Sequence, residues 1–138
     1  MRVFLDANIL FSAAKSDGAI RSLVSLVHDR DHECWVDEYV VIEARRNLQS
    51  KAKGPNDAIM ALDDLLDRCK VSATIVRVAA GNQLDWLPAK DRPVLAAAMA
   101  LRCQVLVTGD RRHFGAGHAK VFGGVTIHSP RSLAERLL

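Results

Sequence analysis

The sequence of 138 residues has only three cysteines and no apolar run long enough to cross a membrane. Cys34, Cys69 and Cys103 are odd in number and include no CxxC pair, which argues against a disulfide framework and a zinc knuckle. A membrane-spanning helix needs about 18 or more apolar residues. The apolar stretch at the start is broken at Asp6 and is too short for a secretion signal. We therefore expect a soluble, cytoplasmic protein with reduced cysteines and no membrane partner.

The sequence also has no internal repeat, no low-complexity tract and no linker rich in Gly, Pro or Ser. Its hydrophobic content of 49% is enough for one continuous core in a chain of this length. We therefore expect a single domain over residues 1–138. A glycine-rich phosphate loop is absent as well, which argues against a nucleoside triphosphatase.

Acidic residues become scarce in the second half of the chain. Residues 1–70 hold ten Lys and Arg against twelve Asp and Glu, whereas residues 71–138 hold nine against four. Two of those four acids, Asp91 and Asp110, belong to the candidate site, so few carboxylates remain elsewhere in this half. Such a surface attracts a polyanion. The alternative, equally open on charge alone, is that a net charge of +3 only keeps the protein soluble.

The chain alternates short apolar runs with helical patterns. The runs predict strands over 2–5, 34–36, 74–78 and 105–108, with an edge strand over 125–128. Apolar spacing predicts helices over 20–27, 37–52, 56–69, 91–102 and 133–138, with Asp37 and Asn56 as helix starts. Loops are expected over 81–89 and 109–117. This alternation predicts a three-layer α/β/α fold with a mainly parallel sheet of four to five strands.

Four carboxylates stand at the edges of these elements. Asp6 and Asp110 follow strands, where open α/β sheets place ligands. Glu43 has apolar neighbours, which places it near the inner face, and a buried carboxylate needs a partner. Each acid also has a structural explanation: Asp6 and Asp91 as helix starts, Glu43 in an ion pair, and Asp110 as a turn former. Their joint placement predicts a site for Mg²⁺ or Mn²⁺ and metal-assisted phosphodiester hydrolysis.

Other polar residues lie close to the four acids in the sequence. Asn8 and Thr108 are candidates for auxiliary hydrogen bonds to a water or a phosphate oxygen. Arg111, Arg112 and Lys120 follow Asp110 and are candidates for contacts with the phosphates that flank the reacting one, or form a solvated basic loop. For the neighbouring histidine, His113, packing beside Phe114 is favoured over contact with RNA or orientation of Asp110.

These residues resemble the PIN-domain nucleases, in particular small bacterial and archaeal forms of the VapC toxin type. The motifs that carry the resemblance are LDANIL, IEARRNL, KDRPVLAAAM and LVTGDRRHF, followed by the closing segment GVTIHSPRSL. The resemblance implies that Asp6, Glu43, Asp91 and Asp110 are the catalytic, metal-binding acids of a Mg²⁺- or Mn²⁺-dependent endoribonuclease. It further implies a homodimer and a small antitoxin whose tail covers the acidic pocket. Some relatives carry a further acid where this chain has Arg112 and His113, which leaves a fifth ligand open.

Other functions remain open at this point. A non-toxin PIN nuclease in RNA processing would use the same acids. A PIN domain that binds RNA or protein without cleaving is argued against by the presence of all four acids. A phosphatase of the haloacid-dehalogenase type is a weak alternative, because Asn8 occupies the position of its second acid. A receiver domain expects an adjacent acidic pair after the first strand, which this sequence lacks.

Overall fold

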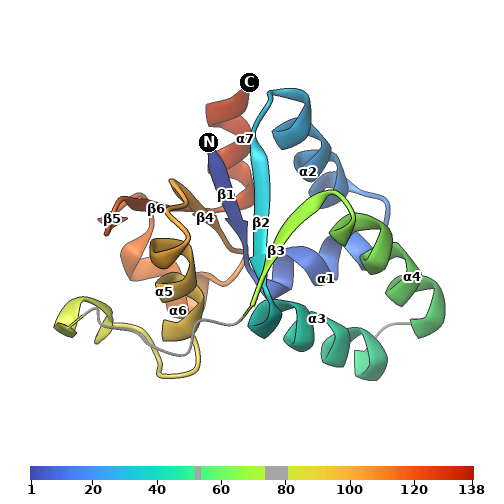
Figure 1. Cartoon of the computed structure of the whole chain (residues 1–138), viewed down its shortest axis with the longest axis horizontal. Helices are drawn as coiled ribbons and strands as arrows, with labels where there is room; N and C mark the ends of the chain where they lie inside the picture. The colour runs from blue at the N-terminus through green and yellow to red at the C-terminus, as the bar shows by residue number, and fades with distance from the viewer. Residues whose placement is uncertain (52–53, 74–80) are drawn as a thin grey trace.

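One sheet of six strands organises the computed structural model, which describes residues 1–51, 54–73 and 81–138. The strands are Arg2–Leu5 (β1), Glu33–Asp37 (β2), Cys69–Ser72 (β3), Val105–Val107 (β4), Val121–Phe122 (β5) and Val125–His128 (β6). Their order across the sheet is β3-β2-β1-β4-β6-β5 (Figure 1). Neighbouring strands run parallel except for the antiparallel pair β5 and β6. The predicted mainly parallel sheet is confirmed, with six strands instead of four to five.

Helices cover the two faces of the sheet. They are Ala7–Lys15 (α1), Ala19–Asp29 (α2), Glu38–Lys51 (α3), Pro55–Leu66 (α4), Arg92–Ala100 (α5), Arg111–Phe114 (α6) and Pro130–Leu137 (α7), with short 3₁₀ turns at Gly81–Leu84 and Gly115–Gly117. Helix α1 packs against α2, α3 and α4, and α2 packs against α7. Helices α5 and α6 lie on the other side of the sheet (Figure 1). The predicted three-layer α/β/α arrangement is therefore confirmed.

The central strands are apolar on both faces because helices cover them on both sides. Val3, Phe4 and Leu5 of β1 are fully buried, and so is every residue of β4. Buried parallel strands characteristically show such continuous apolar runs. Burying the side chain of Phe4 or Leu5 stabilises the fold by roughly 1.5–3 kcal/mol each. This packing fixes the positions at which β1 and β4 end, and with them the polar residues that follow.

Strands β1, β2 and β4 end at the same edge of the sheet because they run parallel. Asp6 follows β1, Asp37 is the last residue of β2, and Thr108 follows β4. All three are polar residues buried in an otherwise apolar core. The carboxyl edge of the sheet therefore concentrates polar groups that need hydrogen-bond partners or a ligand.

The region after α4 differs from the prediction. A helix over 56–69 with Cys69 on its buried face was expected, but α4 ends at Leu66 and Cys69 begins β3. In the sheet, Cys69 lies opposite Cys34 of β2, so parallel pairing rather than helix packing places it. The strand predicted over 74–78 lies outside the described residues.

Three smaller expectations also change. Residue Gly54, with a φ of 61°, caps α4 and Pro55 opens it, so Asn56 lies inside the helix rather than at its start. The loop predicted over 109–117 contains α6, whose start is capped by the side chain of Asp110. Strand β6 has the predicted bounds, but the antiparallel β5 covers it, so β6 is not an edge strand.

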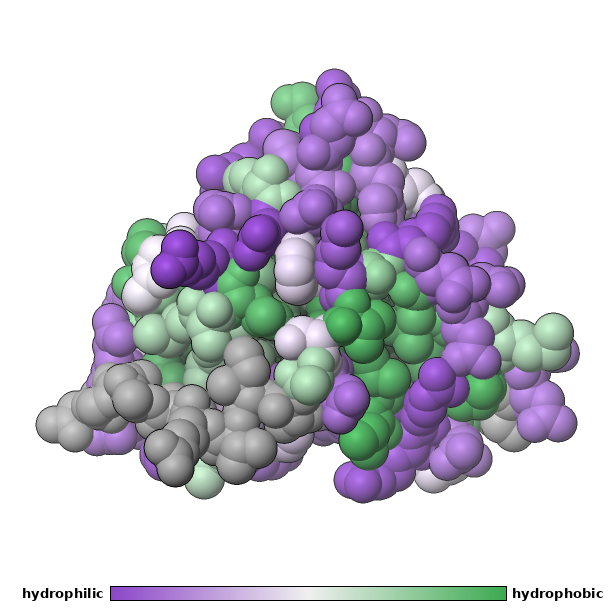
Figure 2. All heavy atoms as spheres, viewed as in Figure 1, coloured by the Kyte–Doolittle hydropathy of each residue, from purple (hydrophilic) through white to green (hydrophobic). Residues whose placement is uncertain are grey.

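Apolar surface gathers on the face drawn in Figure 2, around β3 and α3. Ile42 of α3 and Val71 of β3 are each about half exposed, at 53% and 52%. Among the described residues, no helix has the length and apolar character needed to cross a membrane.

Candidate functional site at the carboxyl edge of the sheet

Asp6 divides its two carboxylate oxygens between the helix and the site. Oδ1 accepts a hydrogen bond from the backbone N–H of Ala7 at 2.7 Å, which caps α1. Oδ2 accepts from the hydroxyl of Thr108 at 2.8 Å and from the amide of Asn8 at 3.2 Å. The capping role and the site role are therefore compatible. Burial raises the pKa of Asp6 to about 6, although the hydrogen bonds from Thr108 and Ala7 act to lower it.

A hydrogen-bond network joins the ends of β1 and β4. The amide of Asn8 also donates to Thr108 Oγ1 at 3.2 Å, and the backbone N–H of Gly109 donates to Asn8 Oδ1 at 2.8 Å. Thr108 Oγ1 accepts the backbone N–H of Asp110 at 3.1 Å. A Cβ at Gly109 would lie 3.3 Å from Asn8 Oδ1, so this position favours glycine. The auxiliary residues predicted from sequence thus hold Asp6 and Asp110 in a fixed relation.

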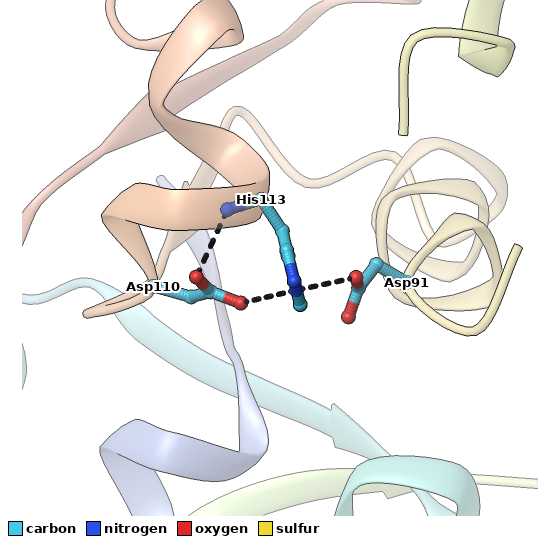
Figure 3. Close-up of side chains that lie close together, drawn as sticks. All are labelled: Asp91, Asp110 and His113. Atoms are coloured by element: carbon cyan, nitrogen blue, oxygen red, sulfur yellow. Dashed lines mark hydrogen bonds and ion pairs between the residues drawn. The ribbon is translucent and has the colours of Figure 1, made fainter. Parts of the chain in front are cut away.

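Asp91 and Asp110 meet at a histidine (Figure 3). His113 Nδ1 lies 2.9 Å from Asp91 Oδ2 and 2.9 Å from Asp110 Oδ2. The other oxygen of Asp110 accepts the backbone N–H of His113 at 3.0 Å, which starts α6. Asp91 stands at the cap position of α5, but its side chain makes no capping hydrogen bond. Asp91 is thus the helix start that the sequence suggested, but its carboxylate turns to His113 instead of the first-turn N–H groups.

The expectation that His113 packs as an ordinary loop residue beside Phe114 is also wrong. Its ring lies between two acids of the site, whereas Phe114 is buried in the core. The sequence contains one half of this arrangement, since His113 follows Asp110 by three residues, one turn of helix. The contact of His113 with Asp91 depends on how α5 and α6 pack, so the sequence around either residue does not predict it.

Glu43 stands apart from the other three acids. The prediction placed it on the inner face of its helix, but Glu43 is exposed, because Val40, Ala44 and Leu48 form the buried stripe of α3. Among the described residues it makes no hydrogen bond or ion pair. Its negative charge nevertheless helps to raise the pKa values of Asp6 and Tyr39, so it lies within electrostatic range of the site.

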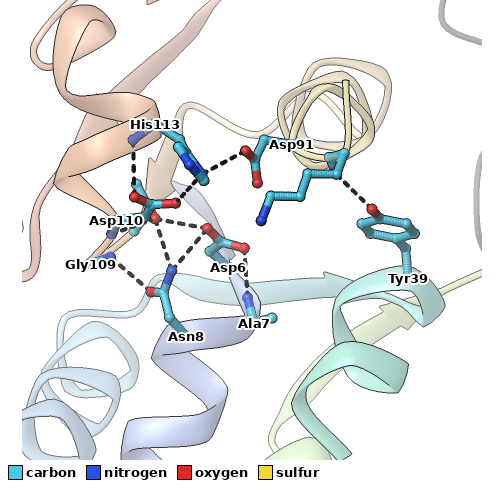
Figure 4. Close-up of polar contacts among 10 residues, drawn as sticks. Asp6, Ala7, Asn8, Tyr39, Asp91, Gly109, Asp110 and His113 are labelled. Atoms are coloured by element: carbon cyan, nitrogen blue, oxygen red, sulfur yellow. Dashed lines mark hydrogen bonds and ion pairs between the residues drawn. The ribbon is translucent and has the colours of Figure 1, made fainter. Parts of the chain in front are cut away.

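Negative charge concentrates around this edge. Burial is the main cause that raises the pKa of Asp91, while the neighbouring His113 and Lys90 act to lower it. The pKa of Tyr39 is raised by burial and then by the charges of the surrounding carboxylates. Its hydroxyl donates to the backbone carbonyl of Lys90 at 2.6 Å, which ties the start of α3 to the loop before α5 (Figure 4).

The residues at this edge fit a divalent cation. Figure 4 shows Asp6, Asp91 and Asp110 directed toward a common space from three different elements. One oxygen each of Asp91 and Asp110 and one nitrogen of His113 lie within 4.8 Å of one another. Among the described residues, the buried atoms Asp91 Oδ2 and His113 Nδ1 have no hydrogen-bond partner. Carboxylate oxygens are the preferred ligands of Mg²⁺ and Mn²⁺, and a cation there would offset the charge of the buried acids.

Arg111, which follows Asp110 directly, borders the acidic site. Arg111, Arg112 and Lys120 are exposed. Arg111 and Asp110 both line a pocket of about 320 Å³, which lies between α6 and the end of β6. A cationic rim beside an acidic centre is the charge pattern of a site that receives an anion and holds a metal.

The fold and this edge define an α/β protein with a carboxylate site at the carboxyl ends of parallel strands. The family model described as PIN domain matches residues 2–112. The chain therefore belongs to the PIN domain family. Comparison with curated proteins gives no match.

Solved structures share this fold. One such structure is VapBC2 from Rickettsia felis bound to a DNA fragment from its promoter. A chain of it superposes with a TM-score of 0.69 at 17% identity, and the match covers 94% of this chain and 98% of that chain. DNA-bound VapBC from Salmonella typhimurium gives 0.66 at 17% identity, with coverage of 94% and 98%. VapBC-1 from nontypeable Haemophilus influenzae gives 0.65 at 15% identity, with coverage of 95% and 99%. At these identities the likeness concerns the fold.

Proposed function

We propose that this protein is a metal-dependent endoribonuclease and the toxin component of a type II toxin–antitoxin system. The observation that carries the proposal is the placement of Asp6, Asp91 and Asp110 around one space at the carboxyl edge of the sheet. Membership of the PIN domain family supports nuclease activity. The shared fold with chains of VapBC structures supports the toxin assignment.

In the proposed reaction Asp6, Asp91 and Asp110 would hold Mg²⁺ or Mn²⁺, and Glu43 would join them from α3. Such an ion, when bound, would supply a water of lowered pKa and offset charge on the phosphoryl oxygens. Asn8 and Thr108 keep the carboxylate of Asp6 in position through the bonds described above. Arg111, Arg112 and Lys120 bind phosphates of the RNA on either side of the scissile bond.

Cleavage of RNA tests the proposal directly. Purified protein is incubated with a mixed pool of structured RNAs and Mg²⁺ or Mn²⁺, with EDTA as one control. Asp110→Asn keeps the size of the side chain and a cap for α6 but removes a charge from the site. We expect it to reduce cleavage by more than about a hundredfold, the order of loss for a group that acts in the transition state.

A matched variant separates the site from the surface. Asp29→Asn makes the same chemical change in an exposed residue at the end of α2, where the chain turns toward the start of β2 at the opposite edge of the sheet. It should cleave like the unmodified protein. Equal activity of Asp110→Asn and Asp29→Asn would overturn the mechanism. RNA binding without any cleavage would favour a binding module.

The proposal includes two protein partners, a second copy of this chain and a small antitoxin. Ile42 of α3 and Val71 of β3 are exposed and provide apolar surface for association, and a second copy of this chain is the occupant that the family resemblance implies. The small antitoxin protein would cover the acidic edge. Light scattering of the purified protein distinguishes a homodimer from a monomer of 15.1 kDa.

A further inference from the structure

His113 occupies an unusual place for a side chain next to two carboxylates. Its Nδ1 is 2.9 Å from an oxygen of Asp91 and 2.9 Å from an oxygen of Asp110 (Figure 3). Neither contact has the geometry of a hydrogen bond, and Nδ1 and Asp91 Oδ2 are both buried. A ring nitrogen that only bridged two carboxylates would point its N–H along at least one of these contacts. His113 Nδ1 and Asp91 Oδ2 therefore need a partner other than each other.

The spacing of the three atoms matches the ligands of one metal ion. Two neighbouring ligands of an octahedral ion, each about 2.1 Å from the metal, are separated by about 3 Å. Both contacts of His113 Nδ1 have this length, and the three ligand atoms lie within 4.8 Å of one another. Little side-chain movement is needed for all three to face one ion. The backbone supports this placement, because the N–H of His113 is fixed to Asp110 Oδ1 at 3.0 Å.

We propose that His113 Nδ1 is a ligand of the metal centre together with Asp91 and Asp110, and that it biases the centre toward Mn²⁺ over Mg²⁺. This inference rests on the proposed function, since it concerns the ion of the same site. Imidazole is a better ligand for transition metals than for Mg²⁺, which prefers oxygen. A mixed nitrogen and oxygen set therefore discriminates between the two ions, whereas a set of carboxylates alone discriminates less.

The competing explanation is that His113 only positions the two carboxylates. In that case its nitrogen stays outside the coordination shell and an ion binds to oxygen alone. Both explanations predict that loss of His113 weakens metal binding, so an affinity alone does not separate them. Direct detection of the nitrogen next to the metal does.

Pulsed electron paramagnetic resonance of bound Mn²⁺ detects a coordinated imidazole nitrogen through its modulation of the electron spin echo. The experiment uses the full chain without RNA, so it does not depend on cleavage. We expect ¹⁴N modulation in the unmodified protein and its replacement by the ¹⁵N pattern after labelling with ¹⁵N-histidine. This measurement on the unmodified chain holds even if a variant fails to fold.

Single substitutions show which histidine supplies the nitrogen that is detected next to Mn²⁺. His113→Gln should abolish the nitrogen modulation, while His118→Ala, which removes an exposed imidazole five residues further on, should leave it unchanged. Titration of both ions by calorimetry adds the selectivity. We expect His113→Gln to weaken Mn²⁺ binding by about tenfold or more and Mg²⁺ binding less, so that the preference for Mn²⁺ falls.

The outcomes separate this inference from the proposed function. Bound Mn²⁺ without nitrogen modulation, or modulation that persists in His113→Gln, overturns the role of His113 and leaves the nuclease proposal standing. Mg²⁺-dependent cleavage by a protein that does not bind Mn²⁺ does the same. Absence of binding for both ions, together with absence of cleavage, overturns both.

Discussion

The carboxyl group of Asp6 is buried at a cost that its hydrogen bonds do not fully offset. The side chain is 5% exposed, and burial raises its pKa to about 6 despite donors from Ala7, Asn8 and Thr108. In the unfolded chain the same group has a pKa near 3.8. The folded protein without metal is therefore destabilised once Asp6 ionises, as expected for a group whose charge is meant to face a cation.

The higher pKa of Asp6 in the folded protein than in the unfolded chain predicts that the stability difference between the unmodified protein and Asp6→Asn depends on pH. Because the folded pKa is raised, the destabilisation is absent below about pH 4, grows as pH rises and is complete above about pH 6. A difference of about two pKa units corresponds to about 3 kcal/mol. Urea unfolding in EDTA should show Asp6→Asn gaining stability relative to the unmodified protein, by roughly 1 kcal/mol more at about pH 7.5 than at about pH 5.

The control for this prediction is the same carboxylate-to-amide change in Asp29→Asn, which lies exposed at the other edge of the sheet. Its stability relative to the unmodified protein should not vary over this pH range. A constant difference for Asp6→Asn across the range would show that the buried carboxyl group does not titrate as its burial implies.

Single residues also show how far the sequence determines the site. The positions of Asp6 and Asp110 could be predicted, because each follows an apolar run and must lie where that strand ends. The exposure of Glu43 could not, since Ile42 before it is apolar and yet about half exposed, which misleads a reading of local hydrophobicity. The contact of His113 with Asp91 joins a residue of α6 to the residue before α5, so only the packing of these two helices creates it.

At the level of whole elements, the junction between β2 and α3 joins the sheet to the helix that carries Glu43. Asp37 ends β2, is buried, and accepts the backbone N–H of Val40 at 3.2 Å in the first turn of α3. Burial raises the pKa of Asp37, so its ionised form costs stability at neutral pH. The junction thus needs the acceptor oxygen more than the charge.

Substitutions at Asp37 distinguish the contribution of its acceptor oxygen from that of its negative charge. Asp37→Asn keeps an acceptor for Val40 and removes the buried charge, so we expect it to be at least as stable as the unmodified protein at neutral pH. Asp37→Ala removes the cap and should cost about 1 kcal/mol. Thermal unfolding of the two variants compares them. Equal destabilisation by Asn and Ala would show that the carboxylate itself is required.

The elements themselves could mostly be predicted from apolar periodicity. Strand β1 lies where its short apolar run placed it, and helix α2 lies where helical spacing placed it, because apolar residues of both elements are buried in the core. Short elements could not be predicted. Strand β5 has two residues and pairs with β6, and α6 has four residues and is capped by Asp110. The sequence around Cys69 continues a helical pattern, so its place in β3 follows from pairing with β2.

In the molecule as a whole, the acidic residues of the site and neighbouring basic residues lie at the same carboxyl edge of the sheet. Asp6 and Asp110 of the site follow the ends of β1 and β4, and the exposed residues Arg111 and Arg112 come directly after Asp110. A phosphate backbone would be attracted by the basic rim while its scissile group meets the acids. That residues 1–138 form one domain remains a prediction, and the shared sheet across both halves of the chain agrees with it.

This arrangement predicts that RNA binding weakens steeply with salt and that three residues account for a definite share of the dependence. Each phosphate neutralised by Lys or Arg contributes about 0.7 to the slope of log K against log salt for a single strand. Replacing Arg111, Arg112 and Lys120 with Gln should therefore lower the slope by about 2, measured with a short single-stranded RNA in an Asp110→Asn background that does not cleave. Arg30→Gln, at the exposed end of α2 and the opposite edge of the sheet, should leave the slope unchanged. A flat salt response of the protein before these substitutions would exclude the basic rim as the RNA-binding surface, whereas a steep response that survives all three would place the phosphate contacts on other residues.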